Sequence, residues 1–349
     1  MMVLSTLLKH TEFGNKMQTF DQTVSRVGFA CKIQKSEGVA DPKLNTKGTT
    51  ITWLNKQSRD VAVARLWDLM KHNISTLHNQ IVWVGGLDRS QRMFRISSDL
   101  LTAYTHDDWM WFYFEPDVVA FLETNLSKTG ELARSLDVRL SFHPGQFCVL
   151  ASENDGIVDR SILEFEYHCD LIRYMGYGKK FQDFKCNVHI GGKRGPAGIQ
   201  AALKKLSPEA RNCLTIENAE YTWGLDSSLE LMHDCALVLD IHHHWIATGE
   251  YIEPDDDRVQ AVAESWRGVR PTIHYSVSRE DVLVDHDPST KPDLVALKSM
   301  GFTSTKLRAH SDLYWNQAVN TWALTFRSVA DIMCESKEKN IASQQLLRT

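Results

Sequence analysis

Histidine and acidic side chains stand at the downstream end of short apolar runs along much of this chain. The runs close at His143, His189, Glu217, Asp240 and His274, and His243 follows soon after Asp240. Short apolar runs bounded by turn residues are typical of buried strands in a parallel sheet. Because the carboxyl ends of such strands meet at one edge, we expect these side chains to converge. A converging set of imidazoles and carboxylates indicates a metal site.

Taken singly, each of these residues has a plainer interpretation. A lone histidine at a strand end is more often a hydrogen-bonded structural residue, a buried acid usually pairs with Lys or Arg, and the run from His242 to His244 could lie exposed at the surface. The joint pattern favours metals, because so many buried ionisable groups would be costly without cations to pair with them. The set exceeds the ligands of one ion, so we expect two or three ions, with Glu217 bridging a pair.

The expected ligand set also limits the chemistry. A site of two or more cations suits in-line displacement at phosphorus, where one ion lowers the pKa of a water and another holds the leaving oxygen. Mixed imidazole and carboxylate ligands favour zinc or manganese over calcium, and the sequence leaves the choice between those two open.

The elements that must position these residues alternate regularly along the chain. Strands are expected at residues 26–33, 93–96, 138–143, 185–190, 213–217, 236–240, 270–275 and 329–335. Helices are expected near residues 60–81, 115–136, 157–175, 197–206, 226–234 and 256–266, from Ser311-Asp312 onwards, and at the C-terminus. Residues 34–58 and 276–309 are expected to be long loops. The eight β-then-α units predict an α/β fold, a single (β/α)8 TIM barrel with its active site at the C-terminal strand ends.

Composition limits the class of protein. The 349 residues are 43% hydrophobic, which is ample for one large core, and we expect residues 1–24 to form a flexible leader and residues 25–349 the barrel domain. The net charge of −5 does not by itself indicate nucleic-acid binding, although bound cations would offset several acidic ligands. No P-loop occurs, and no GxGxxG follows the first strand, so no nucleotide cofactor is expected.

Cysteine usage and the apolar runs indicate the compartment. Seven cysteines without a CxxC pair argue against a cysteine zinc site and favour reducing surroundings. No apolar run reaches the ~20 residues of a membrane span, and Leu4–Leu8 is too short for a signal peptide. We therefore expect a soluble, cytoplasmic protein. We also expect a monomer.

Two further features could contact a substrate. Pro144-Gly145 predicts a tight turn that presents Gln146 and Phe147 beside the metals, although a turn with Phe147 packed inwards is the plainer interpretation. If the substrate is DNA, an aromatic ring next to an amide suits a wedge between bases. Basic residues that include Lys193 and Arg194 follow the expected fourth strand, where they could contact phosphates or simply face solvent.

Nine short motifs follow one another in order along the chain. They are Arg26–Cys31 (RVGFAC), Phe94–Ser98 (FRISS), Ser141–Phe147 (SFHPGQF), His189–Gly192 (HIGG), Thr215–Asn218 (TIEN), Asp240–His244 (DIHHH), Ile273–Ser276 (IHYS), His310–Asp312 (HSD) and Met333–Lys337 (MCESK). Over about residues 25–345 this set resembles the UV damage endonucleases, a family of phosphodiesterases on the (β/α)8 barrel. Each motif is weak alone, but nine in the right order are specific.

The resemblance implies an enzyme that nicks damaged double-stranded DNA directly 5′ to a UV photoproduct or another helix-distorting lesion. It implies a cluster of three divalent ions, typically Mn²⁺, with Zn²⁺ or Mg²⁺ as alternatives. The family's metal ligands correspond here to His106, His143, His189, Glu217, Asp240, His243, His274, His310 and Glu335. Glu217, His143 and Asp240 are the expected catalytic residues. Gln146 and Phe147 would probe the lesion, assisted by the first-loop aromatic residue Phe29.

The chain departs from the family pattern in several places. Thr272 stands where members usually carry a lysine, which can be carboxylated to contact the metals. Phe147 lacks the hydroxyl of the usual tyrosine, and Ile33 replaces a polar residue after the first-loop aromatic. The segment 278–305 is longer than usual. These departures leave the metal core intact and put the lesion range and the rate in question.

Three other functions stay open from the sequence. An abasic-site endonuclease would use the same scaffold on a different lesion. A metal-dependent sugar isomerase would share the barrel and the ligand types but would not need Gln146 or Phe147. A protein that binds damaged DNA without cutting it would agree with the threonine at position 272.

Overall fold

The structure, a computed structural model, describes residues 19–349, and a ring of eight parallel strands forms its centre. The strands are β1 (Val27–Ala30), β4 (Met93–Arg95), β5 (Arg139–Phe142), β6 (Lys185–His189), β7 (Leu214–Glu217), β8 (Ala236–Val238), β9 (Thr272–Tyr275) and β10 (Asp331–Cys334). They are hydrogen-bonded in the order β8-β7-β6-β5-β4-β1-β10-β9. A parallel bridge between Asp240 and His274 joins the two ends, where the His274 amide donates to the Leu239 carbonyl at 2.9 Å. The expected (β/α)8 barrel is confirmed.

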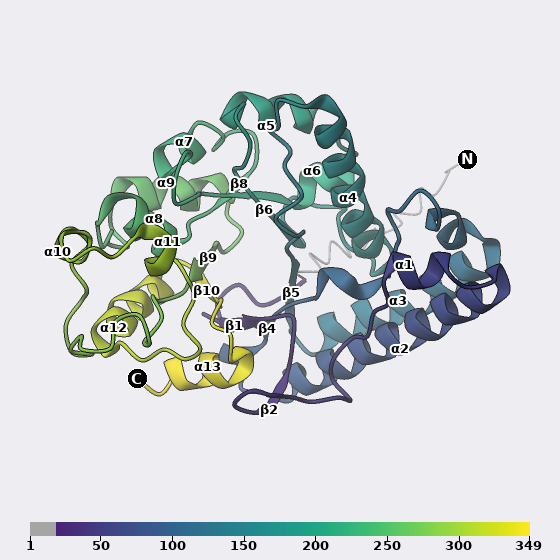
Figure 1. Ribbon diagram of the computed structural model, residues 1–349, viewed down its shortest axis with the longest axis horizontal. Coiled ribbons are helices and arrows are strands. Elements are labelled where there is room, and N and C mark those ends of the chain that lie inside the picture. Colours follow the sequence, from purple (N-terminus) through teal and green to yellow (C-terminus); the bar gives the residue numbers. More distant parts are fainter. Residues whose placement is uncertain (1–18) are drawn as a thin grey trace, which may run out of the picture.

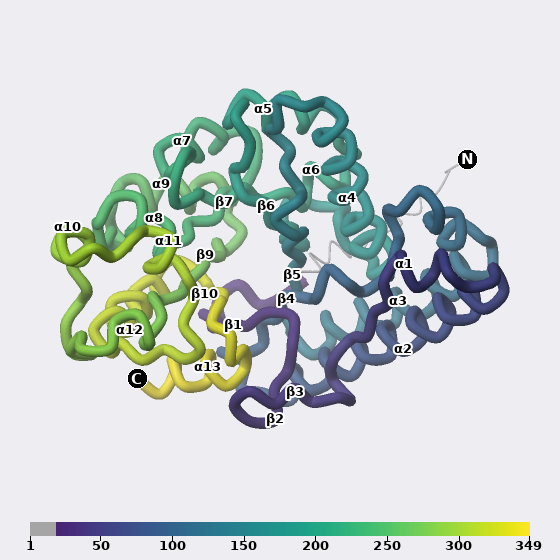
Figure 2. Tube along the Cα trace, viewed as in Figure 1, coloured from purple at the N-terminus to yellow at the C-terminus, as the bar shows by residue number. Residues whose placement is uncertain are grey.

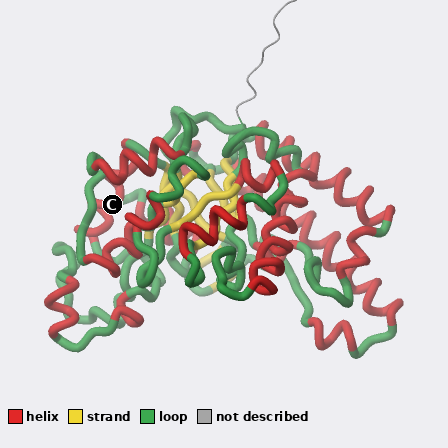
Figure 3. Tube along the Cα trace, turned by 90° about the horizontal axis from the view of Figure 1, so that it is seen from above, coloured by secondary structure: helices red, strands yellow, loops and turns green. Residues whose placement is uncertain are grey.

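Helices surround this ring, as the views from two directions show (Figure 1, Figure 3). They are α2 (Arg59–Gly85), α3 (Pro116–Ser135), α4 (Asp155–Tyr174), α5 (Gly195–Leu203), α6 (Pro208–Cys213), α7 (Leu225–Leu229), α8 (Ile241–Thr248), α9 (Asp257–Ser265), α12 (Gln317–Thr325) and α13 (Lys339–Leu346). Short 3-10 helices span Arg89–Gln91, Ser98–Leu100, Met110–Phe114 and Phe326–Ser328. At least one helix follows each strand of the ring, as the alternation in the sequence predicted.

The first and last strands of the ring lie side by side. Val27 of β1 is opposite Ile332 of β10, and in Figure 2 the purple and yellow parts of the chain meet there. This pairing brings Glu335, which follows β10, to the same rim as the middle of the chain. Residues more than 300 positions apart therefore share one end of the barrel.

Local signals in the sequence begin several of the helices. The Ser58 side chain caps α2 by accepting from the Val61 amide, and Pro116 occupies the first turn of α3. Asp240 caps α8 by accepting from the His242 and His243 amides at 2.8 and 2.7 Å. The same carboxylate thus follows β8 by two residues and starts a helix, which fixes its position at the rim.

The helix expected from Ser311-Asp312 begins later, so that prediction is wrong. Asn316 caps α12, its Oδ1 atom accepting from the Val319 amide at 2.8 Å. The Ser311 amide instead donates to the Val277 carbonyl at 3.0 Å, and Asp312 pairs with Lys337 at 2.8 Å. The Ser311 hydroxyl donates to the Leu313 carbonyl, and Lys337 holds the Asp312 carboxylate, so neither side-chain oxygen caps a helix here.

Two segments expected to be loops contain short regular elements. These are β2 (Gln34–Ser36), β3 (Val39–Ala40), α1 (Ile51–Asn55), α10 (Leu294–Ser299) and α11 (Ser304–Leu307). The last two helices belong to a small apolar cluster formed by Trp245, Ile246, Leu283, Leu294, Leu297 and Leu307. Elements this short carry too few residues for their periodicity to stand out in the sequence.

Part of the segment that was expected to be a flexible leader packs against the barrel at the N-terminal end of β5. Residues 1–18 lie outside the described residues. Phe20 is buried, and the Arg139 guanidinium lies 4.4 Å from its ring centre. The Asp21 amide donates to Asp137 at 2.7 Å, so residues 19–24 belong to the folded body. Among the described residues, no helix has both the length and the apolar character needed to cross a membrane.

Candidate metal centre

Glu217 lies at the centre of the strand ends, with imidazoles on either side. It is the last residue of β7, and it is fully buried. Its Oε1 atom lies 3.1 Å from Nδ1 of His274 and 3.5 Å from Nδ1 of His243. Its Oε2 atom lies 3.2 Å from Nε2 of His143 and 3.8 Å from Nδ1 of His189. Each carboxylate oxygen therefore faces its own pair of histidines.

Two further carboxylates extend the cluster. Oε1 of Glu335 lies 3.3 Å from Nδ1 of His274, and Oδ2 of Asp240 lies 3.7 Å from Nδ1 of His243. Three sets of side chains offer possible ligand atoms within 4.8 Å of one another: His143, His274 and Glu335; His143, His189 and Glu217; and Glu217, Asp240, His274 and Glu335. The residues predicted to converge from different strand ends do lie together.

An open hollow of about 320 Å³ leads to this cluster. His189, His243, His310 and Glu335 line it. The Nδ1 atom of His310 lies 3.0 Å from the Glu335 carbonyl oxygen, which sets the direction of its ring. His106, His243 and His310 belong to none of the three ligand sets, and His106 lines a separate hollow. The role of each predicted residue as a metal ligand stays a prediction.

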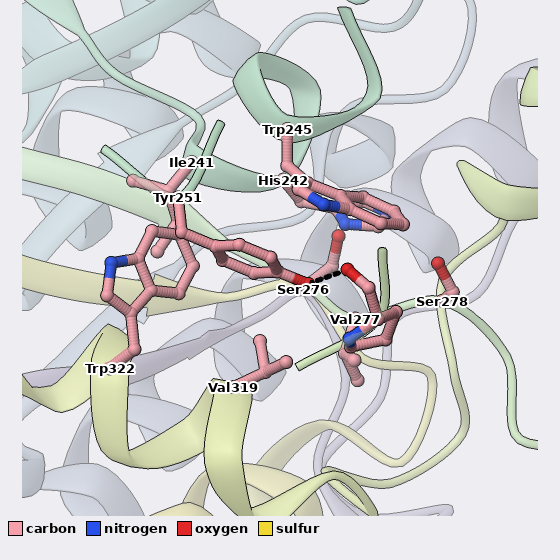
Figure 4. A pocket seen from close by; sticks show the side chains of 10 residues that line it. Ile241, His242, Trp245, Tyr251, Ser276, Val277, Ser278, Val319 and Trp322 are labelled. Carbon is pink, nitrogen blue, oxygen red and sulfur yellow. Dashed lines mark hydrogen bonds between the residues drawn. The ribbon is translucent and has the colours of Figure 1, made fainter. Parts of the chain in front are cut away.

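The run from His242 to His244 is buried, and its exposure at the surface is ruled out. An α-helix turns successive side chains by about 100°, so the three rings of α8 reach different surroundings. His243 faces Glu217, whereas Nε2 of His244 lies 2.9 Å from Glu250. Figure 4 shows His242 in a small hollow, stacked on Trp245 with ring centroids 5.7 Å apart. Of the three, His243 alone belongs to the cluster.

Burial and close charges shift ionisation within the cluster. Burial alone would raise the pKa of Glu217, but the imidazoles around it, His274 first among them, hold this pKa well below its ordinary value. Burial raises the pKa of Asp240 well above its ordinary value, and the charges of Glu217 and Glu335 add to this. Burial lowers the pKa of His143. Opposed shifts within one group of residues are typical of functional sites.

The buried polar atoms at this centre fit metal ligands. Oε1 of Glu217, Oδ2 of Asp240 and Nδ1 of His274 are buried and have no hydrogen-bond partner among the described residues. Such atoms are costly unless something satisfies them, and here they face one another. A divalent cation would satisfy all three at once. Imidazole and carboxylate ligands suit zinc or manganese.

Two polar residues that hold the carboxylates were not predicted from the sequence. Nδ2 of Asn187 donates to Oε2 of Glu217, and Arg95 forms an ion pair with Glu335. A signal was present for Asn187, which precedes His189 by two residues and therefore shares its face of β6. Polar residues at intervals of two before a strand-end ligand indicate a polar barrel interior.

A lysine side chain reaches the candidate metal centre from β6, whereas the family pattern has its lysine at the position of Thr272. Thr272 is buried, and its hydroxyl has no hydrogen-bond partner within the described part of the chain. Nζ of Lys185, on β6, lies 2.8 Å from Nε2 of His274. Burial lowers the pKa of Lys185 to about 7. The interior thus contains an amino group beside a predicted ligand histidine, although position 272 does not supply it.

The predicted probe residues stand in solvent. Gln146 is exposed and Phe147 is 86% exposed, in a turn closed by the Cys148 amide and the Gly145 carbonyl at 2.9 Å. The interpretation in which Phe147 packs inwards is therefore wrong. An aromatic ring this exposed, beside a hollow lined by Gln146, is available to a ligand.

Acidic partners hold both of the basic residues that were predicted to contact phosphates. Lys193 lies 3.0 Å from Glu153, and Arg194 lies 2.9 Å from Asp155. Both follow β6 in the chain, on the rim where its C-terminal end lies. Their contact with DNA stays a prediction.

Phe29 is buried, so the prediction that it assists at DNA is wrong. Its ring packs against Trp83 of α2 at 6.0 Å and against Phe94 of β4 at 5.4 Å, and it is 1% exposed. Successive strand residues point to opposite faces, and this position of β1 faces the helix layer. A sequence motif places Phe29 on the strand but does not show which face it takes.

Comparisons with known proteins agree with this arrangement. A family model described as UV-endonuclease UvdE matches residues 25–349. The UV-damage endonuclease of Schizosaccharomyces pombe is 28% identical over 93% of this chain and 50% of its own length, so the chain spans half of that relative. The UV DNA damage endonuclease of Bacillus thuringiensis is 24% identical over 86% of this chain and 88% of its own length.

Two solved structures share the fold. The crystal structure of SacUVDE has a TM-score of 0.69 and 23% identity, and the match covers 93% of this chain and 97% of that one. Endonuclease IV from Thermus thermophilus has a TM-score of 0.53 and 14% identity, with 93% and 96% covered. At these identities the likeness concerns the barrel.

Proposed function

The chain belongs to the UV-endonuclease UvdE family, and on that premise we propose that it is a DNA repair endonuclease. It cuts the backbone of double-stranded DNA directly 5′ to UV photoproducts and other helix-distorting lesions. The observation that carries the proposal is the position of Glu217, whose two oxygens face separate pairs of histidines. A carboxylate placed in this way suits a pair of cations, the arrangement used for displacement at phosphorus.

The strand-end residues would hold three divalent cations, with Mn²⁺ the expected ion. The proposed ligands are His106, His143, His189, Glu217, Asp240, His243, His274, His310 and Glu335. When bound, such cations polarise the phosphodiester and lower the pKa of a water. Glu217, His143 and Asp240 would lie closest to the reacting phosphate.

Other residues of the chain keep the ligands in place. Asn187 holds one oxygen of Glu217, and Arg95 holds Glu335. Nδ1 of His243 lies 3.0 Å from the Asn218 carbonyl oxygen, which orients its ring. Outer contacts of this kind set the direction and the basicity of metal ligands.

Lesion recognition would depend on the shape of the DNA, because lesions differ in sequence. At a damaged step the bases are weakly stacked, so an exposed ring can enter at low cost. Phe147 would take this position, and the Gln146 amide would hydrogen-bond the displaced base edges. Lys193 and Arg194 would approach the backbone, exchanging their acidic partners for phosphates.

The direct test uses supercoiled plasmid, either untreated or UV-irradiated, incubated with the protein and with Mn²⁺ or a chelator. We expect nicked circles from the irradiated plasmid with Mn²⁺ and none in the other three reactions. Equal nicking of both plasmids, or nicking in chelator, contradicts the proposal. Mapping the cut on an end-labelled duplex with one photoproduct tests the 5′ position.

The same assay separates the other candidate functions. A duplex with an abasic-site analogue would be cut, and a photoproduct duplex left intact, by an abasic-site endonuclease. A sugar isomerase would cut neither duplex. A non-catalytic binder would bind the photoproduct duplex and would leave it uncut with every metal that is tested.

A further inference from the structure

Arg308 is the residue directly after α11, and it lies at the mouth of the open hollow that leads to the cluster around Glu217. It lines the same hollow as Gln146, His243 and Glu335. The Ser278 hydroxyl donates to the Leu307 carbonyl at 2.6 Å, and Ser278 forms a bridge with His310. The backbone on both sides of Arg308 is therefore tied to the chain that leaves β9. Tertiary contacts, and not α11 alone, set the place of this arginine.

Two neighbours hold its guanidinium group. Arg308 donates to the carboxylate of Glu220, and its Cζ atom lies 5.3 Å from the ring centre of Tyr221. Both partners lie on the loop after β7, the strand that ends in Glu217. The Tyr221 hydroxyl lies 3.5 Å from Oγ1 of Thr305 on α11. A guanidinium held in this way has lost part of its rotamer freedom before a ligand binds.

The charge of Arg308 still faces the open hollow. Its side chain is 45% exposed, whereas that of Glu220 is 11% exposed. A guanidinium has five N–H donors, so one carboxylate leaves several for another partner. Glu335 lines the same hollow. A fixed cation at the mouth of a hollow that would otherwise present acidic groups offers an anionic strand a favourable point of approach.

We infer that Arg308 binds a backbone phosphate of DNA at the mouth of the hollow, and that Glu220 and Tyr221 are its positioning residues. The planar guanidinium matches a phosphate through two parallel hydrogen bonds. Such a contact carries no sequence information and fixes the register of the strand over the reacting centre. The inference rests on the proposed function, because it needs a nucleic-acid strand as substrate.

The test measures binding of a labelled duplex with one photoproduct at several salt concentrations, in chelator so that no cleavage competes. Arg308→Gln should weaken binding about tenfold, the loss expected for a charge-assisted hydrogen bond. It should also make affinity less dependent on salt, so that the magnitude of the slope of log affinity against log salt concentration falls by about one. Arg308→Lys keeps the charge and should keep the slope.

Arg267→Gln is the matched control. Arg267 also stacks on an aromatic ring, with its Cζ atom 4.1 Å from the ring centre of Phe181. It lies between α9 and the start of β9, at the opposite end of the barrel from the strand ends. Its replacement should leave both the affinity and the salt slope unchanged.

A second variant separates a phosphate contact from a structural latch. Glu220→Gln releases Arg308 without removing its charge, so the salt slope should equal or exceed that of the wild type. If Glu220→Gln and Arg308→Gln lose the same affinity with unchanged slopes, the pair only fastens α11 to the β7 loop, and the inference is overturned. Thermal melting identifies any variant that fails to fold. If Arg308→Gln fails to fold, the salt slopes of Arg308→Lys and Glu220→Gln decide between a phosphate contact and a structural latch.

Failure of the proposed function gives a different result. A wild-type protein that leaves irradiated plasmid uncut with Mn²⁺ overturns the proposed function and the inference with it. A wild-type protein that cuts, and whose salt slope does not change in Arg308→Gln, overturns the inference alone.

Discussion

Nζ of Lys185 lies 2.8 Å from Nε2 of His274, although their strands, β6 and β9, are not neighbours in the barrel. The other ring nitrogen of His274 faces Glu217 and Glu335 at 3.1 and 3.3 Å. The lysine contact therefore determines which edge of the imidazole meets the carboxylates. Fully buried lysines are rare because the charged form loses its hydration. Here the amino group orients a predicted ligand.

Replacing Lys185 with methionine should weaken metal binding without weakening the fold. Methionine fills a similar volume and removes a buried polar group, so thermal stability in chelator should be equal or higher. Loss of the partner that orients His274 should lower Mn²⁺ affinity roughly ten- to a hundredfold. Calorimetric titration measures this affinity, and Lys204→Met, at an exposed position, is the control. Wild-type affinity in Lys185→Met would refute the orienting role.

Glu217→Gln should remove incision and reduce the bound metal while leaving the barrel folded. An amide keeps the shape but lacks the charge that two cations would share, so the rate should fall at least about a hundredfold. Metal content by mass spectrometry and circular dichroism report the two effects separately. Glu264→Gln, on the exposed face of α9, should change neither. Retained incision would count against a bridging carboxylate.

Phe147→Ala should reduce the preference for damaged DNA more than it affects metal binding. Stacking of one aromatic ring on a base contributes about 1–3 kcal/mol, so the ratio of rates on damaged and undamaged duplexes should fall about tenfold. The ring is 86% exposed, so the free energy of unfolding should hardly change. Met300→Ala removes a side chain that is 72% exposed and serves as the comparison. An unchanged ratio would assign the probing role elsewhere.

Stability should fall in mild acid through His168, which lies outside the ligand set. Burial lowers the pKa of His168 from 6.5 to about 4. The folded protein therefore binds fewer protons than the unfolded chain between these values, and stability is lost as pH falls from 6.5 towards 4. The loss from this group can reach roughly 3 kcal/mol at the acid end.

Urea unfolding at pH 7 and pH 5, in chelator, measures this effect. His168→Gln should show a smaller difference between the two pH values than the wild type. His233→Gln, at an exposed position, should behave like the wild type. An equal pH dependence in wild type and His168→Gln would mean that other groups cause the acid loss.

The barrel and most of the candidate metal centre followed from local patterns in the chain. His143, His189, Glu217 and His274 each close an apolar run, and parallel strands present their C-terminal ends at one rim. Those two facts are enough to gather the side chains, because the position of a residue along its strand depends on nearby sequence alone. Asn187 could have been added by the same reasoning, since it shares a strand face with His189.

The tertiary structure decided which face of its strand a side chain takes and which distant residue it contacts. Phe29 lies on the expected strand, yet it points into the helix layer. Lys185 meets His274 across 89 residues of sequence, and Arg308 meets Glu220 across 88. Such contacts depend on the closure of the ring and on the packing of α10 and α11, which bring side chains together through space. The physical reason is that periodicity records which residues are buried, whereas the partner of a buried or rim side chain depends on the whole fold.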